Sequence, residues 1–169
     1  MQRWLFQREL EEFSGQPVFY LDECGVDHRL DREFGRAPRG ERIYEAVPGK
    51  RRERTSVIGA FRHGKLVAPL AFQGTANTEV VDTYFEKVLL PALPPDSVIV
   101  WDNASFHHSP TTLKLVEAAG HQLLFLPAYS PDLNPIEHFW ATLKPRLRKD
   151  LPAATNPFLF IADTCIYYC

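Results

Sequence analysis

The segment Ser97-Val-Ile-Val-Trp-Asp-Asn-Ala-Ser-Phe-His-His-Ser-Pro110 contains the signals that decide the fold of this 169-residue chain. Residues 97–101 form a short apolar run of strand type, which leads directly into an acidic residue, Asp102. Ser109-Pro110 then opens a helix, because serine caps helix N-termini and proline favours the first helical position. A strand, an acid and a helix in this order indicate an α/β domain.

A second apolar run, 18–21, has the same design and ends at Asp22-Glu23. Active sites in open α/β sheets collect at the carboxyl ends of strands. If the two strands are parallel neighbours, about 4.8 Å apart, Asp22 and Asp102 can share a cation. Without a cation the two carboxylates would repel each other. The alternative for either acid alone is a turn or helix-capping role.

The other predicted elements complete a single domain, 1–169, with a core at 17–150 and a C-terminal tail, 151–169, that we expect to be helical. They are a helix over 2–13, an irregular connection over 24–42, strands over 54–62 and 66–73 joined by a turn, a helix from Asn77 or Thr78 to Pro91, a strand over 122–126 and a helix over 135–149 that Pro145 should kink. This order predicts a mixed sheet with helices on its faces.

The helix at 135–149 supplies a third candidate acid, Glu137. Asn134 is predicted to cap this helix and Pro135 to be its first residue, with Ile136, Trp140, Leu143 and Leu147 packing against the sheet. Glu137 then falls where a capping-box glutamate reaches back to the cap, and this structural role is the alternative. A carboxylate there could instead complete a site of hard oxygen ligands, which favours magnesium or manganese. Adjacent histidines, His107-His108, lack a third soft ligand at useful spacing, so a zinc site is not predicted.

Basic residues are concentrated in two regions, although the net charge is −2. Residues 29–65 hold eleven Lys or Arg against five Asp or Glu, and 144–149 adds four more basic residues. A localised basic surface suits a polyanionic partner, and a solvated charged loop is the alternative. Three cysteines without a CxxC pair favour reduced thiols. No apolar run approaches the roughly 20 residues of a membrane span, and we expect a cytoplasmic protein.

Three motifs together resemble the DDE transposases of the mariner-like superfamily, specifically its bacterial insertion-sequence branch. They are LDECG at 21–25, VIVWDNASFHHS at 98–109 and LPAYSPDLNPIEHFWATLK at 126–144. The 34 residues between Asp102 and Glu137 are a spacing typical of that superfamily, and FGRAPRGER at 34–42 is similar to its loop after the first catalytic strand. The resemblance covers roughly residues 17–150.

This resemblance implies a ribonuclease-H-like fold, a mixed five-stranded sheet with helices on both faces and with its first and fourth strands adjacent and parallel. It implies that Asp22, Asp102 and Glu137 are catalytic and hold two magnesium ions, with manganese as a substitute. Glu23 ranks below Asp22 for the first position. The residues that it suggests as supports of the site or as DNA contacts are Asn103, His107, Arg36, Arg39, Arg42 and Lys144.

The implied activity is phosphodiester hydrolysis and transesterification, which cleaves transposon-end DNA and joins it to a target. The implied partners are double-stranded DNA and further copies of the chain. The first strand begins by residue 17, so we expect any helix-turn-helix portion to be separate or fused by a frameshift. Two alternatives stay open: a catalytically silent remnant that binds DNA or a partner, and a ribonuclease-H-like nuclease with another substrate.

Overall fold

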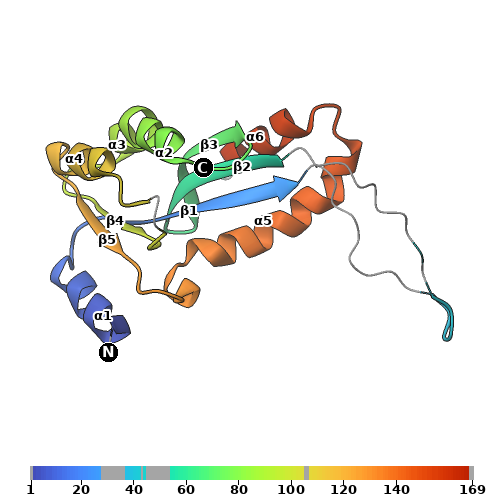
Figure 1. Ribbon diagram of the computed structural model, residues 1–169, viewed down its shortest axis with the longest axis horizontal. Coiled ribbons are helices and arrows are strands. Elements are labelled where there is room, and N and C mark those ends of the chain that lie inside the picture. Colours follow the sequence, from blue (N-terminus) through green and yellow to red (C-terminus); the bar gives the residue numbers. More distant parts are fainter. Residues whose placement is uncertain (1, 28–36, 43, 45–53, 105–106, 168–169) are drawn as a thin grey trace.

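The computed structural model describes residues 2–27, 37–42, 44, 54–104 and 107–167 (Figure 1). The helices and strands in chain order are α1 (Gln2–Glu12), β1 (Val18–Asp27), β2 (Arg54–Arg62), β3 (Lys65–Gln73), α2 (Thr78–Tyr84), η1 (Phe85–Leu89), α3 (Leu90–Ala92), β4 (Val98–Trp101), α4 (Pro110–Ala118), β5 (Gln122–Phe125), η3 (Pro131–Leu133), α5 (Ile136–Asp150), η4 (Leu151–Ala153) and α6 (Pro157–Tyr167). None of the described helices is both long enough and apolar enough to cross a bilayer.

The five strands form one mixed sheet in the order β3-β2-β1-β4-β5. β1 pairs antiparallel with β2, and β2 pairs antiparallel with β3. β1 pairs parallel with β4, and β4 pairs parallel with β5. This order and these directions are those of the ribonuclease-H-like fold, so the predicted fold class is confirmed.

The first strand is longer than the sequence led us to expect. Residues 24–27 were predicted to begin an irregular connection, but they continue β1 and pair with β2, from Cys24 opposite Val57 to Asp27 opposite Arg54. The reason is alternation, because Cys24 and Val26 are buried on one face of the sheet. Asp22 therefore lies inside a paired strand and not at its end.

Alternate residues of each strand pack into cores on opposite faces of the sheet. One face packs against α2, η1 and α4, and its buried members include Phe19, Leu21, Tyr84, Phe85, Ile99, Trp101 and Val116. The opposite face is covered by α5 along β1, by α6 along β3 and β2, and by α1 near β4 and β5. Figure 1 shows α2, α3 and α4 on one side of the sheet and α5 on the other.

Helix α5 is the element that brings Glu137 to the sheet. Its apolar residues Ile136, Trp140, Leu143 and Leu147 are buried, as their spacing predicted. The helix runs from Ile136 to Asp150 and continues through Pro145, which does not end it. Packing of this apolar stripe holds the helix together where proline removes a hydrogen bond.

Gly59 in β2 is the residue directly opposite Asp22 in the β1–β2 ladder. A register shift lies between Ile58 and Ala60, on either side of this glycine. A Cβ atom on Gly59 would lie 2.8 Å from Cδ1 of the buried Leu66, closer than real contacts allow. The absence of a side chain at Gly59 thus leaves room for the Leu66 side chain of β3 on the strand that pairs with β1.

We expect Gly59→Ala to lower the free energy of unfolding by about 1–3 kcal/mol, because it overpacks this position. Urea unfolding measures the change. Leu66→Ala alone should cost about 2–5 kcal/mol. In the double variant the shortened Leu66 side chain leaves room for the new methyl, so the combined cost should be smaller than the sum. Costs that add to within about 0.5 kcal/mol would show that the two positions are independent.

Candidate active site

The parallel pairing of β1 with β4 brings the first two acids together. The β1 residues Val18, Phe19 and Tyr20 each pair with the β4 residue 80 positions later, from Val18 with Val98 to Tyr20 with Val100. The same offset carries Asp22 to Asp102, just beyond the last paired residues. Asp22 points to the α5 face of the sheet, and Asp102 follows the end of β4.

Asn134 fastens the start of α5 to β1, beside Asp22. Its Nδ2 donates to the Leu21 carbonyl at 3.4 Å, and its Oδ1 accepts from the Ile136 N–H at 3.4 Å. The Asn134 N–H itself donates to the Pro131 carbonyl at 2.9 Å, so Glu137 does not form the capping box that was the alternative for it. Glu137 is exposed, and no donor among the described residues hydrogen-bonds to its carboxylate.

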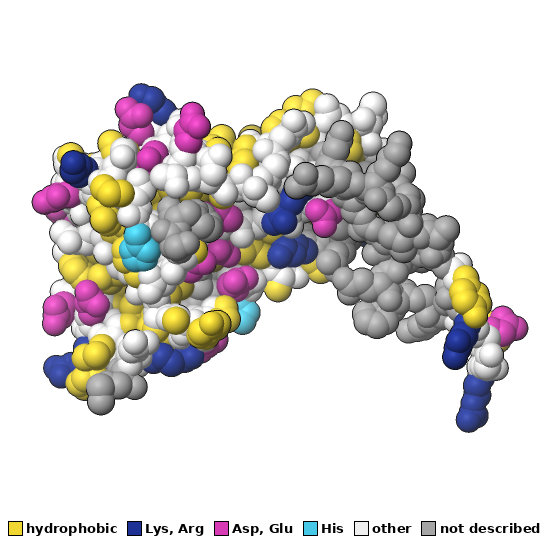
Figure 2. Space-filling model, viewed as in Figure 1, with side chains coloured by type: hydrophobic (Ala, Val, Ile, Leu, Met, Phe, Trp, Pro, Cys, Tyr) yellow, Lys and Arg dark blue, Asp and Glu magenta, His cyan; other side chains and the backbone are white. Residues whose placement is uncertain are grey.

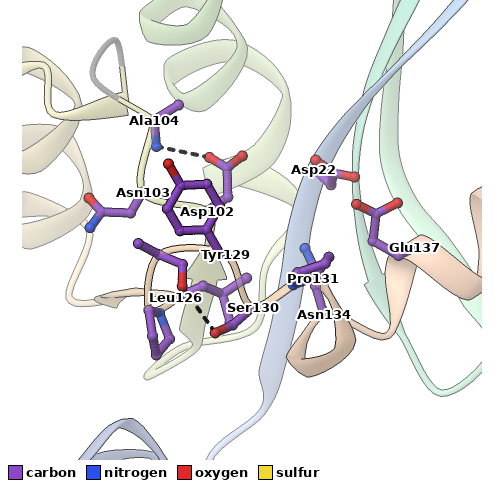
Figure 3. Close-up of a pocket in the computed structure, with 12 residues that line it drawn as sticks. Asp22, Asp102, Asn103, Ala104, Leu126, Tyr129, Ser130, Pro131, Asn134 and Glu137 are labelled. Atoms are coloured by element: carbon purple, nitrogen blue, oxygen red, sulfur yellow. Dashed lines mark hydrogen bonds between the residues drawn. The ribbon is translucent and has the colours of Figure 1, made fainter. Parts of the chain in front are cut away.

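The three acids, Asp22, Asp102 and Glu137, line one pocket of about 410 Å³ (Figure 3). They come from β1, from the end of β4 and from the first turn of α5. Asn103, Ala104 and Asn134 line the pocket as well, and the remaining wall is the loop 126–131. One part of the pocket is therefore acidic, and the loop side is largely apolar.

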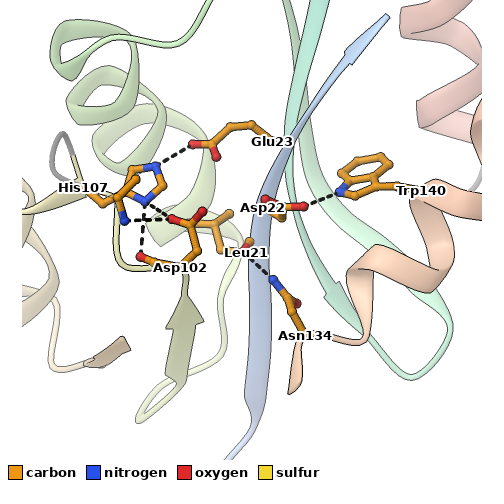
Figure 4. A network of polar contacts seen from close by, with 8 residues as sticks. Leu21, Asp22, Glu23, Asp102, His107, Asn134 and Trp140 are labelled. Carbon is orange, nitrogen blue, oxygen red and sulfur yellow. Dashed lines mark hydrogen bonds and ion pairs between the residues drawn. The ribbon is translucent and has the colours of Figure 1, made fainter. Parts of the chain in front are cut away.

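Asp22 has no positive partner among the described side chains that line the pocket. Its Oδ2 accepts a hydrogen bond from the indole N–H of Trp140 at 2.9 Å (Figure 4). Burial, together with the negative charges of Glu137, Glu23 and Asp102, raises the pKa of Asp22 to about 7, although the Glu23 N–H opposes the rise. The Asp22 carboxylate is therefore difficult to ionise at neutral pH without a cation nearby.

Asp102 is in the opposite situation, because a buried histidine neutralises it. The His107 ring stacks on Trp101 with centroids 3.6 Å apart, and its Nδ1 contacts the Asp102 carboxylate. Its Nε2 lies 3.1 Å from Oε1 of Glu23. Burial lowers the pKa of His107, but Asp102 and Glu23 outweigh burial and raise it to about 9. Burial likewise opposes ionisation of Asp102, and the contact with His107 lowers its pKa overall.

The other site residues suggested by the sequence lie in different parts of the structure. Asn103 lines the pocket, whereas His107 is buried behind Asp102, so its ring is a support of that acid and not a surface group. Lys144 is partly buried on α5, where its charge lowers the pKa of Cys24 against the effect of burial. Arg39 and Arg42 are exposed on the segment 37–42 and do not line the pocket. Arg36 lies outside the described residues.

Of the basic residues in 29–65, the structure describes Arg39, Arg42, Arg54, Arg62 and Lys65, and it describes the helix that carries the second basic region, 144–149. On the face drawn in Figure 2, the coloured Lys and Arg side chains are dispersed among acidic ones.

Two contacts of the site were not predicted from the sequence. Trp140 was expected only to pack against the sheet, yet it also donates to Asp22. The signal was available, because a buried tryptophan N–H normally requires an acceptor. The tie between Glu23 and His107 joins residues 84 positions apart, and no local pattern predicts it.

The acids share a pocket, but they are not drawn into a cluster. Among the described residues, no group of three or more His, Cys, Asp or Glu is arranged to hold a metal ion. Electrostatic repulsion between the carboxylates explains this spacing. Trp140 holds Asp22 and His107 holds Asp102, and each contact restrains its acid.

Solved structures of Mos1 share this fold. The Mos1 strand transfer complex gives a TM-score of 0.66 at 17% identity, over 98% of this chain and 56% of that chain. The catalytic domain of Mos1 mariner transposase gives 0.55 at 16% identity, over 98% and 85%. Mos1 paired end complexes described with Mn and with Mg give 0.63 and 0.64, at 18% and 16% identity, over 98% and 99% of this chain and 57% and 59% of theirs.

The protein thus spans little more than half of the Mos1 chains in those complexes. No curated protein matches the sequence significantly. The family model described as DDE superfamily endonuclease matches residues 17–156, which include all three acids and most of the chain. The chain belongs to the DDE superfamily of endonucleases.

Proposed function

We propose that this protein is the catalytic domain of a DNA transposase, which cleaves transposon-end DNA and joins it to a target. The observation that carries the proposal is the meeting of Asp22, Asp102 and Glu137, from three distant segments, in one pocket. Within the family we assign the chain to the mariner-like insertion sequences of bacteria, on the motifs at 98–109 and 126–144.

The pocket suits divalent cations, and we propose that the three acids hold two magnesium ions, with manganese as a substitute. Carboxylate oxygens are the hard ligands that both cations prefer. The negative charge of Asp22 is not balanced by a positive side chain from the described lining of the pocket. A cation beside Asp22 would relieve its repulsion by the neighbouring acids. Glu137 is exposed and makes no hydrogen bond to a described residue, so its side chain can turn toward Asp22 at little cost.

When bound, such ions activate a water or a 3′-hydroxyl as the nucleophile and stabilise the leaving oxygen. The protein's own part is to hold the three carboxylates. The Trp140 N–H orients Asp22, His107 orients Asp102, and Asn134 keeps the first turn of α5 against β1. Leu126, Pro127 and Pro131 form a largely apolar wall beside the acids.

We propose double-stranded DNA as the partner, both as transposon ends and as target, with further copies of the chain assembled on it. The similar Mos1 structures are described as strand transfer and paired end complexes. Arg39, Arg42 and Lys144 are proposed to contact phosphates, which position DNA without reading its sequence.

Asp102→Asn and Glu137→Gln should each reduce magnesium-dependent cleavage by more than about 100-fold. Loss of a metal ligand should cost more activity than loss of a residue that only orients a ligand, which typically costs about 10- to 100-fold. Both variants should bind DNA within about 3-fold of the original protein, since phosphate contacts lie elsewhere. Gel assays measure cleavage of a duplex carrying the ends that flank the gene, and fluorescence anisotropy measures binding. Glu117→Gln, an exposed change on α4, is the matched control and should keep full activity.

Cleavage by either variant at the original rate would contradict the proposal. The same assay separates the alternatives. Preferential cleavage of an RNA–DNA hybrid would indicate a nuclease with another substrate. DNA binding without cleavage would indicate a silent remnant.

Asp22→Asn should stabilise the metal-free protein at pH 8 and should leave its stability nearly unchanged at pH 4. The pKa of Asp22 rises from 3.8 to about 7 on folding, so its ionisation disfavours the folded state increasingly between these values. Asparagine keeps an acceptor for Trp140 and removes the charge. We expect a gain of roughly 1–3 kcal/mol at pH 8, measured by thermal unfolding in EDTA.

Asp27→Asn, an exposed change on the same strand, is the control and should alter stability little at either pH. Added magnesium should stabilise the original protein and not Asp22→Asn. Equal destabilisation by Asp22→Asn at both pH values would show that the carboxylate is structurally required and is not strained.

A further inference from the structure

Tyr129 lines the acidic pocket and has two unusual features. Its side chain is fully exposed, and its backbone conformation is unfavourable. Its side chain is 100% exposed, and its φ is +56°. A residue other than glycine rarely adopts such a φ, and a bulky one does so at a cost in free energy. An aromatic ring in open solvent contributes no packing that would offset this cost.

The conformation around Tyr129 is held from both sides. On one side the Leu126 N–H donates to the Trp101 carbonyl at 2.7 Å, directly before Asp102. On the other side Ser130 is buried, and its Oγ donates to the Ala128 carbonyl at 3.3 Å. The Leu133 N–H then donates to the Ser130 carbonyl at 3.1 Å. The ring is therefore presented by a loop anchored to the same strand end that carries Asp102.

The pocket that Tyr129 lines combines an acidic part with an apolar part, so a ligand that fills it must suit both. Its lining includes three carboxylates, and the loop side of the lining includes Leu126, Pro127, Ala128, Tyr129 and Pro131. Figure 3 shows the Tyr129 ring beside Asp102 and Asn103 at this wall. A nucleotide has both characters, because its phosphate can meet cations held by the acids while its base offers a flat apolar face. A bare phosphate or a purely apolar ligand has only one of them.

We infer that Tyr129 stacks on a nucleobase of the bound DNA next to the phosphate that reacts, an inference that rests on the proposed function. The ring is a fixed platform for the base and places the neighbouring phosphate over Asp22, Asp102 and Glu137. Stacking accepts any of the four bases, since each has an aromatic face. Tyr129 is thus a positioning residue that acts through the DNA.

The test uses a duplex of the flanking ends in which 2-aminopurine replaces single bases on either side of the cleaved bond. Binding is followed in the Glu137→Gln background, so that no cleavage intervenes. At one position the fluorescence should be quenched by the original tyrosine and by Tyr129→Phe, and it should recover in Tyr129→Ala. Tyr129→Ala should also weaken binding roughly 5- to 150-fold, the factor that one stacked base contributes. Tyr167→Ala, an exposed tyrosine on α6 outside the pocket, is the matched control.

Tyr129→Gly adds a readout that a merely structural tyrosine would not give. Glycine tolerates a positive φ, so this variant should melt at a higher temperature than Tyr129→Ala and lose the quenching all the same. Equal quenching by Tyr129→Ala and the original protein would overturn the inference while cleavage by the unmodified protein still supported the proposed function. Equal loss in Tyr129→Phe and Tyr129→Ala would assign the effect to the hydroxyl and overturn stacking. A protein that bound none of these duplexes would overturn both.

Discussion

The parallel pairing of β1 with β4 is the contact on which the candidate site depends. It aligns Asp22 with Asp102 through a single offset along the chain, while the antiparallel β1–β2 ladder on the other side holds β1 in place. Helix α5 then adds Glu137 from a third segment, tied to Leu21 through Asn134. Because the three acids are separated by dozens of residues, only the completed sheet can bring them to one pocket. The site is a property of the fold and not of any local motif.

Bringing negative charges together has an energetic cost, and the protein distributes it unequally. Asp102 is compensated by His107, which is itself shared with Glu23 and stacked on Trp101. Asp22 has the Trp140 N–H and the Glu23 N–H but no positive side chain from the described lining of the pocket, and its ionisation remains disfavoured. Glu137 avoids the cost by staying exposed. This uneven compensation fits a site that is completed by cations, since full compensation from the protein would leave the cations little to neutralise.

The sequence predicted most of the fold, because its signals were strong and local. Apolar runs ending in acids, a hairpin turn at 63–65 and the apolar stripe of α5 each predicted one element, and their order predicted a mixed sheet with helices on its faces. The adjacency of the first and fourth strands came from the family resemblance. The predicted end of β1 was wrong. Polar residues and a glycine masked the alternation of buried and exposed residues over 24–27, which only pairing with β2 reveals. In the pocket the three acids were named in advance, whereas the contacts of Trp140 and His107 were not. The contact of Trp140 with Asp22 and that of His107 with Glu23 join side chains more than 80 residues apart, and such distances leave no periodicity to read.

The continuation of β1 to Asp27 has a consequence for how a substrate is accommodated. Asp22 sits mid-strand with neighbours on both sides, so its backbone cannot swing as a loop would. Asp102 follows a buried strand. Glu137 lies in the first turn of α5, and its exposed side chain is free to turn. Rigidity thus decreases from the first acid to the third. If the proposed DNA duplex bound at this edge, it would meet a fixed acid in the sheet and a mobile acid at the start of the helix. The bending required for a close fit would then fall mainly on the nucleic acid.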